Sequence, residues 1–159
     1  MPAPDPFWST NYYAHPPLTE RAVAEAQHVL GVTLPPELLD LLALQNGGYT
    51  QGFAHPMGQR TTWAEDHIPL DDLSGILPWD AESPMNLFRT PELTVEWGLP
   101  PKQVLLSGDG HYWITLDYRS GPEPSVAWID VECDEDMQIA PSFGAFLNGL
   151  VPGSTFAPE

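Results

Sequence analysis

The first third of the chain carries a clear helical pattern. Beyond position 18, apolar residues recur every three or four positions, while Arg21, Glu25 and His28 share the opposite face of the same helix. The apolar positions are Ala22, Val23, Ala26, Val29 and Leu30. Thr19 is a residue type that caps helix N-termini, and Gly31 is one that ends helices. We therefore predict a first helix between these two residues, with His28 on its solvent-exposed face.

A second helix is predicted within the segment LPPELLDLLALQNGG, residues 34–48. Leucines occupy positions 38, 39, 41, 42 and 44, which is too many for a single stripe, so we expect this helix to be largely buried. Pro36 suits the first turn of a helix, where its missing N–H costs no hydrogen bond. Asn46, Gly47 and Gly48 tolerate positive φ and are therefore expected to end the helix, with no ligand needed to explain them.

The middle of the chain, residues 49–100, has a weaker pattern. The segment GFAHPMGQRTTW is compatible with a loose hairpin, and IPLDDLSGI with a short segment that opens a helix at Leu70–Leu73. Prolines at positions 84, 91 and 100 interrupt the following stretch. They leave room for one short helix around Pro91–Trp97.

The last third alternates in a way that is typical of strands. The segments QVLLS, HYWITLDY and SVAWIDVE are separated by the turn-forming stretches GDG and RSGPEP, which predicts a three-stranded antiparallel meander. In the central strand one face is apolar and the other mixed. The apolar face carries Tyr112, Ile114, Leu116 and Tyr118, and the mixed face carries Trp113, Thr115 and Asp117. The segment SFGAFLNGLV has its aromatic residues and leucines at helical spacing and predicts a short helix that lies on the sheet.

Together these elements predict an α+β fold. We expect a single domain in which a largely antiparallel sheet is flanked by N-terminal helices and a short C-terminal helix. Residues 1–17 are rich in proline and lack both periods, so we predict an extended arm that packs on the body through aromatic side chains. These side chains are Phe7, Trp8, Tyr12 and Tyr13. Residues 18–159 form the domain itself, which is large enough to bury a core without a disulfide or a metal.

The charge balance of the chain bears on its function. The chain has 22 Asp and Glu against five Lys and Arg, a formal net charge of -17. Such a charge repels nucleic acid and anionic lipid and favours a cationic partner. The acidic residues are spread along the whole chain, so the folded surface must carry them. An acidic surface also keeps a protein soluble, and charge alone does not separate this reading from specific steering of a partner.

The compartment is indicated by the N-terminus and by cysteine usage. The N-terminus lacks the basic start and continuous apolar stretch of a secretory signal, and no run approaches the roughly 20 apolar residues of a membrane span. We therefore expect a soluble cytoplasmic protein. The single cysteine, Cys133, has no internal partner, and the acidic residues around it disfavour a reactive thiolate.

Three local patterns raise the question of catalysis or metal binding. Ser107, Asp109 and His111 lie in the turn SGDGHY, but neighbouring turn residues rarely point at one another as nucleophilic catalysis requires, and no G-x-S-x-G elbow is present. The segment DVECDEDMQ fails the spacing of a calcium loop, because Glu135 stands at the glycine position, and a solvated acidic strand end is favoured. The five histidines show no zinc spacing. We predict no enzyme activity and no cofactor.

Several short motifs occur in a fixed order between about residues 18 and 151. They are Gly31 with Leu34 and Pro35, then Asn46, Gly47 and Gly48, then Gly108 to Tyr112 with Leu116 and Asp117, and finally Pro141 to Leu147. In this order and spacing they resemble the SUKH superfamily, the Smi/Knr type of immunity and cell-wall regulatory proteins. The chain departs from that pattern at Gln27, where members often have Glu, at Leu38, where an aromatic is common, and in the arm before Leu18.

The resemblance implies an α+β fold and, for bacterial members, an immunity protein that binds and neutralises a toxin, often a nuclease. Basic nuclease toxins would be attracted by the acidic surface. We expect the contact residues on the turns and strand ends of the meander: Asp109, His111, Asp117, Asp130, Glu132, Asp134, Glu135 and Asp136. The alternative hypothesis is a regulatory or scaffold module that binds an endogenous protein. A third, an enzyme that uses Ser107, Asp109 and His111, is disfavoured by the turn geometry.

Overall fold

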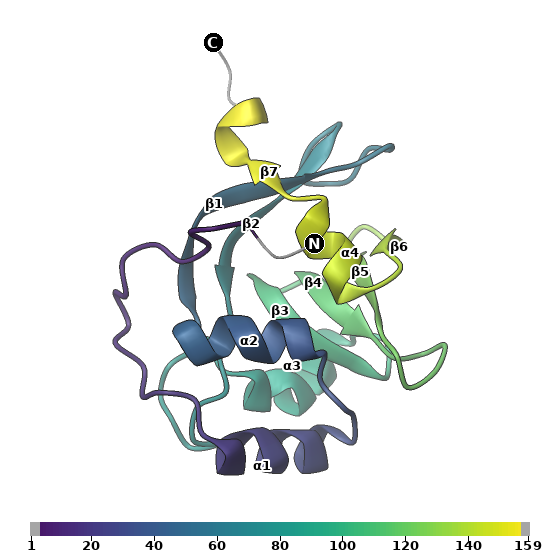
Figure 1. Ribbon diagram of the computed structural model, residues 1–159. Helices are drawn as coiled ribbons and strands as arrows, with labels where there is room; N and C mark the ends of the chain where they lie inside the picture. Colours follow the sequence, from purple (N-terminus) through teal and green to yellow (C-terminus); the bar gives the residue numbers. More distant parts are fainter. Residues whose placement is uncertain (1–3, 157–159) are drawn as a thin grey trace.

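The computed structural model describes residues 4–156, which form two antiparallel sheets with helices packed against them; the end of the β1–β2 hairpin projects away from α1, α2 and α3 (Figure 1). The helices are α1 (Glu20–Leu30), α2 (Pro36–Leu44), α3 (Thr90–Trp97) and α4 (Phe143–Asn148), with the 3-10 helices η1 (Leu87–Arg89) and η2 (Gly153–Phe156). One sheet has the order β2-β1-β7, with β1 at Gly48–Pro56, β2 at His67–Leu73 and β7 at Val151–Pro152. The other has the order β3-β4-β5-β6, with β3 at Gln103–Asp109, β4 at Tyr112–Asp117, β5 at Ser125–Asp130 and β6 at Glu135–Ala140. The predicted α+β class is confirmed.

The structure describes most of the predicted arm and most of the predicted domain. Residues 1–3 of the arm and 157–159 of the domain lie outside the described residues. Within the arm, Phe7 is buried and stacks on Phe53 of β1 with ring centroids 5.5 Å apart. The indole N–H of Trp8 donates to the carbonyl of Leu41 at 2.8 Å. Tyr12 is largely exposed, but its ring centroid lies 6.0 Å from that of Tyr49 in β1, and that of Tyr13 lies 5.4 Å from the same ring. All four aromatic side chains of the arm therefore lie against the body.

Helix α1 has the boundaries that its sequence indicates. The Thr19 side chain accepts a hydrogen bond from the backbone N–H of Ala22 at 3.1 Å, which satisfies a donor that the first helical turn leaves free. Gly31 ends the helix in the left-handed region, at φ 70°. His28 is exposed, as predicted.

Helix α2 ends differently from the prediction. Its Leu38, Leu41 and Leu42 are buried, but Leu44 is exposed and the capping residue Gln45 is extended, at φ -152°. The helix therefore stops before Asn46, and Gly48 already begins β1. The expectation that the glycines end the helix is wrong, because the chain leaves α2 directly in an extended conformation.

Asn46 and Gly47 instead join three segments in the interior. The buried Asn46 amide donates to the carbonyls of Pro16 and Ile76 at 3.0 and 2.9 Å, and its side-chain oxygen accepts from the N–H of Ile76 at 2.8 Å. Gly47, at φ 83°, approaches the backbone of Gly75 so closely that a Cβ atom would collide with it. The motif therefore ties the arm, β1 and the segment after β2 together.

Strands β1 and β2 form a hairpin that is longer than the loose one predicted. Phe53 pairs with Leu70, and Pro56 pairs with His67. The predicted helix at Leu70–Leu73 is wrong, because these residues belong to β2. The reason is tertiary: the strand pairs with β1 and buries Ile68, Leu70 and Leu73 in the main core.

The second sheet has one strand more than the predicted meander. The acidic segment after β5 turns and returns as β6, with Asp130 paired to Glu135 and Ile129 to Asp136. Met137 and Ile139 pack against the main core, while Asp136 between the turn and Met137 is exposed. This alternation of exposed polar and half-buried apolar residues is a strand pattern, which is hard to see when the segment is read as a charge run.

The second sheet packs against the main core on one face and against α3 over part of the other. On one face, Ile114, Leu116 and Trp128 join the main core with α2 and α4, as the apolar face of the predicted central strand requires. On the other, Trp113 packs with Leu99, and they belong to a small cluster that also contains Leu105, Ala127 and Ile129. Leu93 of α3 packs against this cluster, so α3 shields one part of the mixed face and leaves the rest to polar residues.

Candidate functional site

The eight predicted contact residues fall into two groups on the second sheet. The β3–β4 turn and the β5–β6 turn lie at the same end, because consecutive antiparallel strands place alternate turns together. We call this the turn end; it contains Asp109, His111, Asp130, Glu132, Asp134 and Glu135. The other two, Asp117 and Asp136, are brought together by Arg119.

His111 links the two turns of the turn end. Its Nδ1 lies 2.8 Å from a carboxylate oxygen of Asp130, and its Nε2 lies 3.5 Å from a carboxylate oxygen of Glu132. Its backbone carbonyl accepts a hydrogen bond from the N–H of Val131 at 2.9 Å. The hydrogen bond to Asp130 raises the pKa of His111, and the negative charges of Asp130, Glu132 and Asp109 add to this effect. Protonation of His111 therefore changes the charge of this end of the sheet.

Asp130 supports the turn end from inside and does not present its carboxylate to solvent. Only 1% of the residue is exposed, and its oxygens accept hydrogen bonds from the hydroxyl of Thr62 at 2.6 Å and the N–H of Glu132 at 3.1 Å, besides the contact with His111. Burial opposes ionisation, but these hydrogen bonds outweigh it and lower the pKa of Asp130. Of the predicted contact residues, Asp130 is thus a buried carboxylate that positions its neighbours.

The loop between β1 and β2 completes the turn end. The N–H of Thr62 donates to a carboxylate oxygen of Glu135 at 2.8 Å, and the indole N–H of Trp128 donates to the same oxygen at 2.9 Å. The next residue, Trp63, is 46% exposed, and its ring lies 6.0 Å from that of Tyr112. Sequence reasoning missed Thr62 and Trp63, because no local pattern connects this loop with strands that are about 70 positions away.

Asp117 and Asp136 form a separate group whose charge Arg119 compensates in part. Arg119 donates to Asp117 at 2.9 Å and to both oxygens of Asp136 at 2.7 Å. Gln103 also donates to Asp117 at 2.9 Å. Burial opposes ionisation of Asp117, but the bonds from Arg119 and Gln103 lower its pKa, and the two carboxylates raise the pKa of Arg119 further. One guanidinium thus neutralises part of the charge that the sequence places here.

A cleft of about 460 Å³ lies on the side of the β3–β4 turn that faces α3. Its lining includes Trp97 and Glu96 of α3, Asp72 of β2, and Ser107 and Asp109 of β3. The hydroxyl of Ser107 donates to Asp72 at 2.7 Å. Burial raises the pKa of Asp72, and the carboxylates of Asp71 and Asp109 raise it further, although the bond from Ser107 acts in the opposite direction. Only Asp109 of this cleft was among the predicted contact residues.

The same geometry bears on the enzyme hypothesis. Ser107 donates its hydroxyl to Asp72, whereas the ring of His111 contacts Asp130 and Glu132. The side chains of Ser107 and His111 therefore do not form the nucleophile–base pair that covalent catalysis needs. Among residues 4–156, there is also no group of three or more His, Cys, Asp or Glu side chains placed to hold a metal ion.

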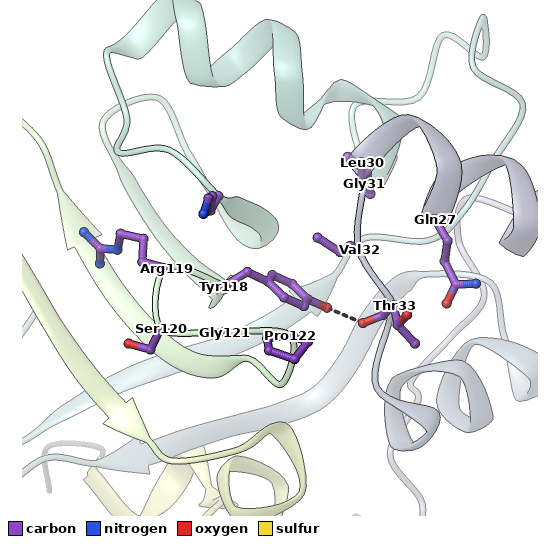
Figure 2. A pocket seen from close by; sticks show the side chains of 11 residues that line it. Gln27, Leu30, Gly31, Val32, Thr33, Tyr118, Arg119, Ser120, Gly121 and Pro122 are labelled. Atoms are coloured by element: carbon purple, nitrogen blue, oxygen red, sulfur yellow. Dashed lines mark hydrogen bonds between the residues drawn. The ribbon is translucent and has the colours of Figure 1, made fainter.

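A larger cavity, of about 670 Å³, lies at the far end of α1 (Figure 2). Its walls come from the end of α1 and from the segment after β4, and Figure 2 shows the Tyr118 hydroxyl directed at the carbonyl of Thr33, to which it donates at 2.7 Å. Burial raises the pKa of Tyr118 well above its usual range. The lining includes Lys102 and Arg119 but no carboxylate, so this cavity is unlike the turn end in charge.

The acidic β5–β6 turn also contains Cys133. Cys133 is exposed in the β5–β6 turn, where desolvation and the surrounding carboxylates raise the pKa of its thiol, which disfavours a reactive thiolate.

Among the described residues, the helices are all too short or too polar to cross a bilayer.

Comparison with known proteins identifies the family. No curated protein matches the chain. The model of the SMI1 / KNR4 family (SUKH-1) matches residues 17–149, a range that runs from just before α1 to the end of α4 and includes both sheets except β7. The match covers well over half of the chain and confirms the resemblance seen in its motifs. This chain therefore belongs to the SMI1 / KNR4 family (SUKH-1).

Proposed function

We propose that this chain is a non-catalytic immunity protein that acts in the cytoplasm and neutralises a toxin by binding it. The family supports a domain of the immunity or cell-wall regulator type, and the side chains of Ser107 and His111 give no support to catalysis. The net charge of -17 favours a basic toxin, of which nucleases are a common class because they bind phosphates.

The observation that carries the proposal is the acidic surface of the turn end. Asp109, Glu132 and Asp134 are exposed there, and Glu135 lies beside them with Trp63. Exposed carboxylates around an aromatic side chain are suited to a basic protein surface, since aromatic residues supply contact area and the charges steer the partner. Asp117 and Asp136 belong to this proposed surface to a lesser degree, because Arg119 already pairs with them.

Rescue from toxicity tests the function directly. A basic toxin domain encoded beside this chain is expressed in a bacterial host with and without the chain, and survival is measured. We expect the chain to restore growth and to form a complex whose association slows steeply between low and high salt. No rescue, combined with a growth or envelope defect when the gene is deleted, would support the alternative, a regulatory or scaffold module.

Charge reversal locates the surface. Glu132 and Glu123 are both exposed and flank the same strand, β5, at opposite ends. We expect Glu132→Lys to slow association with the toxin about tenfold at low salt and Glu123→Lys to change it by less than about twofold. Equal effects of the two substitutions would mean that only the overall charge matters and would remove the turn end from the proposal.

A further inference from the structure

The cleft beside the β3–β4 turn has an aromatic wall. Trp97 is the last residue of α3, which Gly98 ends at φ 67°, and 38% of Trp97 is exposed. Its ring lies over Gly110, where an added Cβ would stand 3.4 Å from the indole. The carbonyl of Gly110 accepts a hydrogen bond from the indole N–H of Trp113 at 2.7 Å. The indole of Trp97 is therefore held against a turn that is itself fixed in place.

Carboxylates line the same cleft from three different elements. Asp72 comes from β2, Glu96 from α3 and Asp109 from β3. One oxygen of Asp72 accepts from Ser107, while the other accepts no hydrogen bond from any of the residues 4–156. Arg89 also lines the cleft, but its guanidinium lies 3.5 Å from Glu92. The cleft thus combines an exposed indole with an excess of negative charge.

This combination matches one side chain better than others. A guanidinium is planar and can stack on an indole, and its N–H groups can donate to two carboxylate oxygens at once. An ammonium group is a compact and strongly hydrated point charge, which gains less from a flat aromatic wall. The volume of about 460 Å³ admits an arginine side chain together with part of the backbone that carries it.

We propose that this cleft receives an arginine side chain of a basic protein partner, which stacks on Trp97 and is held by Asp72, Asp109 and Glu96. The inference rests on the proposed function for the partner's basic character, and charge complementarity with a chain of net charge -17 supports it. It also assigns a binding role to Trp97 and Asp72, which line the cleft and do not belong to the turn end.

The test uses the full chain and a small probe. Acetyl-Gly-Arg-Gly-amide is titrated into ¹⁵N-labelled protein while the indole N–H signals are followed, and the matched probe replaces arginine with citrulline, which has nearly the same shape without the charge. We expect the arginine peptide to shift the Trp97 signal saturably, at about millimolar affinity, and the citrulline peptide to bind at least tenfold more weakly. Equal shifts from both peptides would overturn the proposal.

Substitutions locate the binding. Asp109→Asn and Glu96→Gln change exposed residues of the cleft, and each should weaken binding of the arginine peptide about threefold or more. Asp80→Asn and Trp79→Ala are the controls: both residues are exposed and lie outside the cleft lining, so these substitutions should leave binding unchanged. Trp97→Phe keeps an aromatic wall, so it should bind more weakly than the parent chain and more tightly than Trp97→Ala. Binding that survives Trp97→Ala in a folded protein would contradict the assignment.

The probe experiment is independent of the toxin experiment. Peptide binding without rescue from any toxin would leave the cleft assignment intact and refute the immunity function. Rescue that Asp109→Asn and Glu96→Gln do not affect, together with a silent Trp97 signal, would refute the cleft and leave the immunity function standing.

Discussion

Two acidic groups on the same sheet differ in how much charge they offer a partner. Asp117 and Asp136 share the guanidinium of Arg119, so much of their charge is compensated within the chain. At the turn end, neither Asp109 nor Asp134 forms an ion pair with any residue that the structure describes. Carboxylates that look alike in the sequence thus fall into two groups: some are paired with Arg119 inside the protein, and others have a charge that a partner can reach.

The turn end is also organised around a buried member, which has no counterpart in the other group. Asp130 is buried and bonded to Thr62 and His111, so it fixes the two turns and the β1–β2 loop relative to one another. We therefore expect the acidic residue with the greatest effect on stability, Asp130, to differ from those with the greatest effect on binding, which are exposed.

The largest expected effect comes from removing the buried carboxylate. Asp130→Ala opens a cavity at a buried position and removes the acceptor of the Thr62 hydroxyl and the His111 ring, and we expect it to lower the free energy of unfolding by about 2 kcal/mol. Asp109→Ala, which removes an exposed carboxylate of the same turn end, should change it by less than about 0.5 kcal/mol. Urea denaturation followed by tryptophan fluorescence measures both; similar values would contradict the division of roles.

A smaller effect is expected at the other group. Arg119→Ala breaks contacts with two carboxylates and should destabilise the protein by about 1 kcal/mol, because most of this pairing is near the surface. Arg21→Ala is the control, since the ion pair of Arg21 within the described residues is with Glu25, one turn along α1, and its loss should cost about 0.3 kcal/mol. If the Arg119 variant proved as stable as the control, the bridge would contribute nothing and both carboxylates would count as available charge.

The pH dependence of stability separates the two groups without removing a carboxylate. The pKa of His111 is raised in the folded protein, so its protonated form stabilises the fold. This contribution is complete below about pH 6.5, the pKa of an unfolded histidine, and is lost as the pH rises through the folded value. We expect thermal unfolding scans between pH 5.5 and 8.5 to show a decline that is smaller in His111→Gln. An identical decline in both chains would contradict a linked histidine at the turn end.

The smallest expected effect reports the local field. The carboxylates around Cys133 raise the pKa of its thiol, so alkylation by iodoacetamide at pH 8 should be several-fold slower than in the chain unfolded in urea. Salt at about 1 M should remove part of this difference by screening. Ser120→Cys in a Cys133→Ser chain should react faster than Cys133, because Ser120 is exposed and lines the cavity that contains Lys102 and Arg119 but no carboxylate. The opposite order would show that the turn end carries no excess negative field.

Much of the fold was predictable because it depends on local periods. The boundaries of α1 follow from Thr19 and Gly31, and α3 lies where its prolines leave room for a helix. Two of the errors, both at strands, have a common cause. The segment Leu70–Leu73 and the acidic segment that becomes β6 are strands because of their partners across the sheet, which no local window contains.

The candidate site was predictable only in part. The family motifs pointed to the β3–β4 turn, and that turn does lie beside the acidic β5–β6 turn. Thr62, Trp63, Asp72 and Trp97 could not be found in this way, because they come from the β1–β2 loop, β2 and α3.

The sequence by itself determined the net charge, the family motifs and the elements whose apolar residues repeat with their own period. The tertiary structure decided which carboxylates are paired, buried or free, because ion pairing and desolvation depend on distances in space. Asp136 meets Arg119 across 17 positions and Asp130 meets Thr62 across 68. The cleft at Trp97 likewise exists only where β2, α3 and the β3–β4 turn are packed together.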